Sequence, residues 1–362
     1  MALQPAAALA RSLIDRAALS LGAISPVRVR KFGALVDDTL TDPPGSYVSG
    51  KDPLTTDHSE GLGRSLSLNL APLAGHATAA EQAEEASRAM RGLVGDYLGR
   101  DALYWLDGRT EGARRNGHRW AHWGAVLGTR FDRNGMAESS ITYEWGPDFT
   151  DTFPEALYRL ARVAIDALPG LRPAFSTIRC GRSSGSQQIT FEIDAPLALA
   201  NLKPLMDRLG LGAQHASLMS ACAFILGARF TLPPNSARIT LRPISTGVEL
   251  RLDVELSAIP DLPPQLMSLL RLQMGERPRS LAALNQWLDA FTLEGYEHPG
   301  GLSVLSVWVR PDVPARIALY LRPAVIDEPP AASPPEGHET GEPNPATVVT
   351  DSAPVAAGRW EG

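Results

Sequence analysis

The sequence predicts an α+β fold in which α-β-β-α units repeat and close into an antiparallel β-barrel of about ten strands ringed by α-helices. Three observations predict this fold. Strand-like runs come in pairs joined by turn signals, amphipathic helical segments separate the pairs, and the strands alternate between aliphatic and polar residues. The chain has 362 residues, of which 44% are hydrophobic and 20% charged, as is usual for a globular protein.

The N-terminal region begins with a helical pattern. Residues 3–21 have apolar side chains at every fourth position, which predicts an amphipathic helix. Arg11 and Asp15 interrupt its apolar residues, so this segment lacks the pattern of a secretion signal, and we expect a cytoplasmic protein. A strand is expected at 61–70 and a second helix at 79–98.

Four pairs of strand-like runs follow, each joined by a turn signal. The dipeptide Asn134-Gly135, for example, is a strong signal for a hairpin. The expected strand pairs are 121–131 with 136–146, 174–182 with 186–194, 236–244 with 247–257, and 302–310 with 315–322. Helical sequence between the pairs occupies 152–168, 196–228 and 262–295, the last interrupted at Gly275 and Pro278.

The two faces of the expected strands differ in chemistry. From Val248 to Leu256 every second residue is aliphatic, and the four residues between them are charged. If the helices cover the aliphatic faces, the polar faces gather on the opposite side of the sheet. A sheet of about ten strands curls until its edges meet, and a barrel of that size has room for a ligand. We therefore predict a polar, arginine-lined lumen; an open sheet with helices on one side is the alternative.

Composition excludes several classes of protein. The chain contains no continuous apolar stretch of about 20 residues, so we expect no membrane span. Its net charge of −6 gives no reason to expect a nucleic-acid partner. Two cysteines are too few for a disulfide framework or a four-cysteine zinc site.

The C-terminal 40 residues differ from the rest of the chain. Residues 323–362 contain eight prolines and seven acidic residues, a composition that cannot bury enough apolar surface to fold. We therefore expect one folded domain over residues 1–322, followed by a disordered tail over 323–362, and we expect the protein to be a monomer.

The hairpin at 131–141 resembles a strand–turn–strand segment of the cyanobactin-type peptide prenyltransferases. That family has an arginine in the turn followed by Leu-Ala-Glu-Ser-Ser; here Arg133 lies in the turn, Met136 replaces the leucine, and 137–140 read Ala-Glu-Ser-Ser. The strand order, the helix positions and the last strand, which contains Tyr320, are also similar to that family over about residues 55–322. The resemblance implies the αββα (ABBA) prenyltransferase barrel.

The resemblance also implies an activity. It implies transfer of a dimethylallyl or geranyl group from an isoprenoid diphosphate to a side chain of a ribosomally made, cyclic peptide. Arginines neutralise the leaving diphosphate, aromatic faces stabilise the allylic cation, and a carboxylate takes the proton of the acceptor. Mg²⁺ would assist through the diphosphate, with no metal site built from the chain's own residues. Two alternatives remain open: an indole or phenol as acceptor on the same barrel, and a barrel that binds a ligand without catalysis.

Candidate ligands for the diphosphate lie on the polar faces of the expected strands. They are Arg238, Arg242, Arg251, Arg316 and Arg322, together with Tyr320. The resemblance adds Glu60 as the acceptor-side base and Arg64 as a diphosphate ligand, because the family carries a carboxylate four residues before a basic residue there. Leu66 and Leu68 share the parity of this pair, which would turn it outward unless a bulge at Gly61 resets the face.

Further residues are expected to line the lumen or to meet the acceptor: Glu138, Thr142, Glu144, Thr190 and Trp308. Thr142 departs from the family, which tends to place a lysine at this point of the strand. A threonine supplies no charge, and Glu144 on the same face is acidic. Either neighbouring arginines compensate, or the barrel binds something other than a diphosphate.

Overall fold

A computed structural model describes residues 6–47, 52–61, 64–73, 77–115, 122–145 and 153–327. Ten strands form its centre: β1 (Leu54–Ser59), β2 (Leu66–Leu70), β3 (Ala125–Asp132), β4 (Gly135–Glu144), β5 (Leu171–Gly181), β6 (Gly185–Ile193), β9 (Ala237–Ile244), β10 (Gly247–Glu255), β11 (Gly300–Arg310) and β12 (Val313–Pro323). The two short strands β7 (Leu197–Ala198) and β8 (Thr231–Leu232) pair with each other outside this sheet.

The ten strands close into a barrel in the order β1-β12-β11-β10-β9-β6-β5-β4-β3-β2. Neighbouring strands are antiparallel all the way round, and hairpins make most of the connections. The closing pair is β1 with β12, in which Asp57 lies opposite Tyr320. The predicted closed barrel is therefore confirmed, and the open sheet is excluded.

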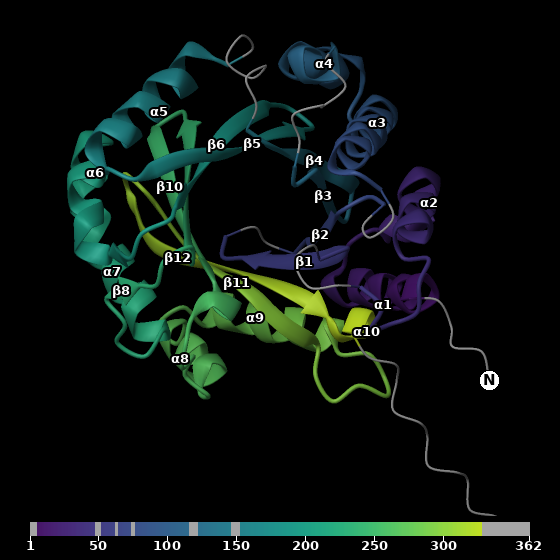
Figure 1. The fold of residues 1–362 in the computed structure, drawn as a ribbon. Helices are drawn as coiled ribbons and strands as arrows, with labels where there is room; N and C mark the ends of the chain where they lie inside the picture. The colour runs from purple at the N-terminus through teal and green to yellow at the C-terminus, as the bar shows by residue number, and fades with distance from the viewer. Residues whose placement is uncertain are drawn as a thin grey trace, which may run out of the picture. The chain divides into compact units, whose positions relative to one another are not determined.

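Helices surround the barrel on its outside (Figure 1). They are α1 (Ala6–Leu21), α2 (Arg30–Thr39), α3 (Ala79–Tyr97), α4 (Arg100–Arg115), α5 (Glu155–Ala167), α6 (Lys203–Arg208), α7 (His215–Ile225), α8 (Leu266–Gln273), α9 (Pro278–Phe291) and α10 (Ala324–Asp327). Within the described part of the chain, none of these helices is both long and apolar enough to cross a lipid bilayer.

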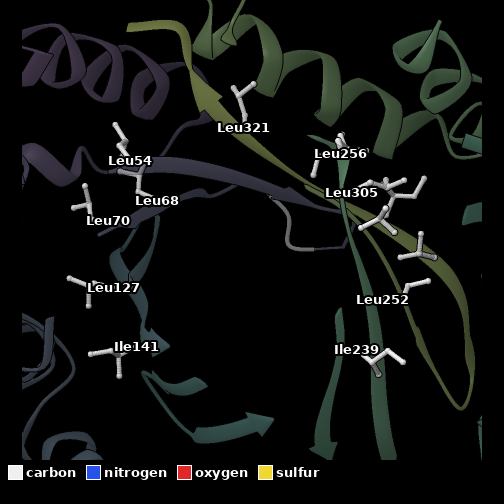
Figure 2. Packing of buried hydrophobic residues seen from close by; sticks show 14 of the residues in the cluster. Leu54, Leu68, Leu70, Leu127, Ile141, Ile239, Leu252, Leu256, Leu305 and Leu321 are labelled. Atoms are coloured by element: carbon white, nitrogen blue, oxygen red, sulfur yellow. The ribbon is translucent and has the colours of Figure 1, made fainter. Parts of the chain in front are cut away.

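The hydrophobic core lies between the barrel and the helices. The aliphatic face of each strand points outward; Leu127 of β3 and Ile141 of β4, for example, pair in register and are fully buried (Figure 2). Trp287 of α9 is the largest of these buried side chains, and its Nε1 donates a hydrogen bond to Thr56 Oγ1 over 3.3 Å. Because the aliphatic residues face the helices, the residues that alternate with them face the lumen.

The expectations about the elements fail at three places. Of the strand expected at 61–70 only 66–70 is a strand, β2; its hairpin partner β1 lies before the expected range, and Gly61, whose φ of +89° favours glycine, is in the turn between them. On the outward face of β1 the buried Leu54 is followed by Thr56 and His58, so the sequence gives no aliphatic alternation to recognise.

Helix α4 was also not expected. Its sequence mixes charged residues, such as Glu111 and Arg115, with a short apolar set in which Leu103 and Leu106 pack against the core, so no long apolar stripe predicts the helix. At the other end of the chain, the fold continues through α10, with Val325 and Ile326 buried. The folded domain therefore extends five residues beyond the predicted boundary at residue 322.

Candidate active site

The lumen of the barrel holds two adjoining cavities. The first, which we call the aromatic chamber, has a volume of about 300 Å³, and its walls include Trp123, Phe175, Arg238, Glu255 and Tyr320. The second, which we call the arginine chamber, has a volume of about 250 Å³, and its walls include Arg130, Arg179, Arg242, Arg251 and Arg310. Gly128, Ser140, Arg179, Arg251 and Tyr320 line both chambers, so the two cavities meet at these residues.

Glu138 binds two arginines of the arginine chamber. Arg179 Nη1 donates to Glu138 Oε1 over 2.9 Å, and Arg130 Nη2 lies 3.7 Å from Glu138 Oε2. Burial opposes ionisation of Glu138, but Arg179 and Arg130 outweigh it and lower the pKa of the carboxyl group. Glu138 is therefore an anion at neutral pH.

Glu249 binds two more arginines of the same chamber. Arg242 donates from Nε over 3.0 Å and from Nη2 over 2.8 Å, and Arg310 Nε donates over 2.8 Å. Burial again opposes ionisation, and the two arginines lower the pKa of Glu249 below its ordinary value. The guanidinium group of Arg310 also lies over the ring of Trp308, 4.9 Å from its centroid.

Arg251 and Tyr320 connect the two chambers. Arg251 Nη1 donates to Tyr320 Oη over 3.2 Å, and Arg251 Nε donates to Asp253 Oδ2 over 3.0 Å. Burial lowers the pKa of Arg251, but Asp253 and Tyr320 outweigh it and raise the pKa above its ordinary value. Burial raises the pKa of Tyr320, so its hydroxyl group stays protonated and can donate a hydrogen bond.

Asp57 of β1 is the carboxylate beside this junction. It lines the arginine chamber, lies opposite Tyr320 in the strand register, and accepts a hydrogen bond from Asn69 Nδ2 over 3.1 Å. Burial raises the pKa of Asp57, although Asn69, Arg179 and Arg251 act in the opposite direction. A raised pKa makes a carboxylate a better proton acceptor near neutral pH.

The aromatic chamber has a different lining. The rings of Trp123 and Phe175 meet edge to face, 4.9 Å between centroids, and the Arg238 guanidinium lies 5.8 Å from the Phe175 centroid. Thr142 Oγ1 and Thr190 Oγ1 each share a hydrogen bond with a threonine hydroxyl group on the neighbouring strand. This chamber therefore offers aromatic faces and neutral hydroxyl groups beside charged residues that include Arg238, Asp253 and Glu255, and an aromatic guest can pack against its rings.

The structure brings most of the predicted site residues together. Arg238, Arg251, Thr142, Thr190 and Tyr320 line the aromatic chamber, whereas Glu60, Glu138, Arg242 and Trp308 border the arginine chamber, as do Arg251 and Tyr320. Thr142 faces the lumen as expected. The arginines that lie nearby come from β5, β9 and β10 rather than from its own strand.

Four predicted residues lie outside both chambers. Arg64 is exposed in the connection between β1 and β2. Arg316 donates to the carbonyl oxygen of Ala315, and Arg322 is held by Asp52 and Asp327. Glu144 Oε2 accepts hydrogen bonds from the backbone N–H groups of His122 and Trp123. These residues lie near the ends of the strands or beyond them, where alternation no longer fixes which side chains face the cavity.

Glu60 has protein partners on both carboxylate oxygens. Its Oε2 accepts a hydrogen bond from the backbone N–H of Ile317 over 2.7 Å, and its Oε1 lies 3.2 Å from Arg277 Nε. Glu60 directly follows β1, next to the turn residue Gly61, and it borders the arginine chamber although its parity is that of the outward-facing Thr56 and His58. Asp57 and Glu60 both line the arginine chamber, but Asp57 lies within β1, opposite Tyr320, whereas the oxygens of Glu60 are held by Ile317 and Arg277.

Sequence reasoning missed several lining residues. Arg130, Arg179, Arg310 and Glu249 were not selected, although each lies on the polar face of an expected strand, so the alternation itself was the signal that identifies them. Asp57 had no such signal, because β1 itself was not recognised.

No family model matches the sequence, and no curated protein matches it. Among solved structures, the chain is similar to prenyltransferase PriB in its apo form, with 16% identity, a TM-score of 0.65, and coverage of 92% of this chain and 100% of that chain. At this identity the likeness shows that the two proteins share a fold.

Two further solved structures are similar over the same extent. The 5-dimethylallyltryptophan synthase from Streptomyces coelicolor, in complex with DMASPP and Trp, has 15% identity and a TM-score of 0.65, and the match covers 93% of this chain and 100% of that chain. A 6-dimethylallyl tryptophan synthase has 12% identity and a TM-score of 0.68, with coverage of 92% and 100%. The chain therefore has the αββα barrel of these prenyltransferase structures.

Proposed function

We propose that this protein transfers a short prenyl group from an allylic diphosphate to an aromatic acceptor. The observation that carries the proposal is one continuous lumen with a five-arginine chamber at one side and an aromatic chamber at the other. The solved structures with this fold support it, because they include a PriB complex with product diphosphate and a PriB complex with L-tryptophan and dimethylallyl thiolodiphosphate.

The donor diphosphate binds in the arginine chamber, where guanidinium groups match phosphate oxygens in charge and geometry. Dimethylallyl and geranyl diphosphate are the donors we propose. When the allylic C–O bond breaks, its electron pair leaves with the diphosphate. Arg242, Arg251 and Arg310 stabilise that developing charge, and the hydroxyl group of Tyr320 donates a further hydrogen bond.

The allylic cation then lies at the junction of the chambers, against Tyr320 and facing the aromatic rings. A carbon of the acceptor ring attacks the cation and forms the new C–C bond. The proton on that ring carbon passes to the carboxylate of Asp57, which restores the aromatic ring. Atoms and charge balance, since the products are the prenylated ring, diphosphate and protonated Asp57.

We propose that the acceptor is a free indole or phenol compound. A chamber of about 300 Å³ is at the lower end of the range for small-molecule sites and suits a single ring system. The acceptor in the similar structures that contain one is tryptophan. The peptide acceptor that the sequence predicts remains a prediction, and an acceptor screen tests it directly.

Magnesium also remains a prediction. Among the described residues no group of three or more histidine, cysteine or acidic side chains is arranged to hold a metal ion. Glu138, Glu249 and Asp253 each bind guanidinium groups instead. These residues do not form a metal site, so Mg²⁺ that assists the reaction would be held through the oxygens of the diphosphate.

The test is a product screen. The protein is incubated with dimethylallyl or geranyl diphosphate, with and without Mg²⁺, and with tryptophan, indole, a naphthol, or a cyclic peptide containing Tyr and Trp. Released diphosphate is quantified, and mass spectrometry detects the prenylated acceptor. We expect products with the free aromatic compounds; products from the peptide alone would overturn the proposed acceptor class, and no product or diphosphate from any pair would overturn prenyl transfer.

Two variants separate the candidate bases. Asp57→Asn is expected to reduce turnover at least about 100-fold, the usual contribution of a general base. Glu60→Gln keeps an oxygen that can accept the N–H of Ile317, so we expect a much smaller loss. A larger loss from Glu60→Gln than from Asp57→Asn would reverse the assignment.

A further inference from the structure

The arginine chamber contains its own anions, and they use the same donors that a diphosphate needs. Glu249 accepts from both Nε and Nη2 of Arg242, which is the fork that binds a carboxylate or a phosphate through two parallel hydrogen bonds. It also accepts from Nε of Arg310. One carboxylate thereby engages the best-directed donors of two lumen arginines.

Glu138 of β4 also pairs with two arginines of the chamber, through one hydrogen bond and one longer ion pair. It binds Arg179 over 2.9 Å and lies 3.7 Å from Arg130, and Arg242 is close enough to contribute to lowering its pKa. The two clusters therefore belong to one charged network within the chamber. Four guanidinium groups and two carboxylates leave a net charge of +2, against +4 for the arginines alone.

When the chamber holds no ligand, its arginines need anionic partners from the protein. Several guanidinium groups facing one another in a partly buried cavity repel each other and lack solvation, and each is stable there only with an anionic partner. The side chain of Glu249 is 14% exposed and that of Glu138 is 23% exposed, so both carboxylates are inside the wall rather than in bulk water. They supply the missing negative charge when no ligand is bound.

We propose that Glu138 and Glu249 are internal counter-anions that pair with the lumen arginines in the empty protein and are displaced by the donor diphosphate. This inference rests on the proposed function, because it takes a diphosphate as the competing anion. Both carboxylates stabilise the empty fold and weaken donor binding. Removing the charge of either one therefore has two effects of opposite sign.

The experiment uses inorganic pyrophosphate as the probe. Its dissociation constant is measured by isothermal titration calorimetry for the wild type, Glu138→Gln and Glu249→Gln, and the melting temperature of each protein is recorded with and without pyrophosphate. The matched control is Glu85→Gln, which removes a carboxylate of α3 that accepts hydrogen bonds from Nε and Nη2 of Arg88, away from the lumen.

The expected result is a lower melting temperature for empty Glu249→Gln, together with pyrophosphate binding about tenfold tighter than in the wild type, the size of one charge-assisted hydrogen bond. Glu138→Gln should change in the same direction, and Glu85→Gln should bind like the wild type. A purely structural glutamate would lower the melting temperature and leave binding equal or weaker.

The experiment distinguishes failure of the counter-anion role from failure of the proposed function. Wild-type binding of pyrophosphate with equal or weaker binding by both glutamine variants overturns the counter-anion role and leaves prenyl transfer standing. No binding of pyrophosphate or dimethylallyl thiolodiphosphate by any of the proteins overturns the proposed function, and this inference with it. If one glutamine variant does not fold cooperatively, pyrophosphate binding by the other variant decides whether the glutamates act as counter-anions.

Discussion

Acidification is expected to destabilise the barrel through His58. This residue lies on the outward face of β1, with its ring 5.7 Å from the Trp287 ring, and its Nε2 has no hydrogen-bond partner among the described residues. Burial lowers the pKa of His58 from 6.5 to about 4. The unfolded chain therefore binds a proton at a higher pH than the folded chain, and stability is lost as the pH falls from 6.5 towards 4.

The magnitude follows from the two pKa values. A fall from 6.5 to about 4 corresponds to about 3 kcal/mol of unfolding free energy at full effect. Between about pH 7.5 and about pH 4.5 the expected loss from His58 alone is about 2.5 kcal/mol. This is a large fraction of the total stability of an ordinary domain.

Urea unfolding at the two pH values measures this loss, with His58→Gln as the matched variant because glutamine does not titrate. We expect the wild type to lose about 2.5 kcal/mol more than the variant on acidification. Equal pH dependence in the two proteins would show that His58 is solvated. It would refute the assignment of the faces of β1, and with it the position of Asp57 in the lumen.

Three further predictions concern single side chains. Asp57→Asn should raise the melting temperature at neutral pH although it lowers turnover, because burial raises the pKa of Asp57 above its unfolded value and the ionised form then costs stability. The gain should shrink as the pH falls, and a lower melting temperature at neutral pH would contradict this. Trp287→Ala should cost about 3–5 kcal/mol in urea unfolding, since the side chain is only 2% exposed. Thr78→Ala should cost about 1 kcal/mol in the same assay, because Thr78 and Glu81 form a capping box at the start of α3; no change would mean that α3 begins elsewhere.

The barrel was predictable because its strands alternate strictly. In β9 and β10 the aliphatic residues Ile239 and Leu252 pair in register on the outer face, while Arg238 and Asp253 pair on the inner face. A hairpin with this pattern leaves few alternatives for its register, since a shift of one residue would bury the charges under the helices.

The site was only partly predictable for the same reason. Alternation identifies which face a residue is on, and it correctly placed Arg238, Arg242 and Arg251 in the lumen. It cannot tell how far along the barrel a side chain lies. Arg322, near the end of β12, is on the polar face but binds Asp52 and Asp327 instead.

Asp57 shows a second limit on what the sequence can predict. Its strand carries Thr56 and His58 on the buried outer face, and these are buried against Trp287, a residue far along the chain. Because that partner comes from tertiary packing, a polar strand of six residues looks like a loop when it is read alone. The β1 carboxylate that faces the lumen was therefore missed in favour of Glu60, three residues further on.

The proposed function depends on a lumen in which the diphosphate site and the acceptor site are separate. A crystal structure of the protein with dimethylallyl thiolodiphosphate and tryptophan tests it most directly. We predict diphosphate density among Arg242, Arg251 and Arg310, with the indole ring between Trp123 and Tyr320. Diphosphate in the aromatic chamber, or both ligands bound outside the barrel, would contradict the account.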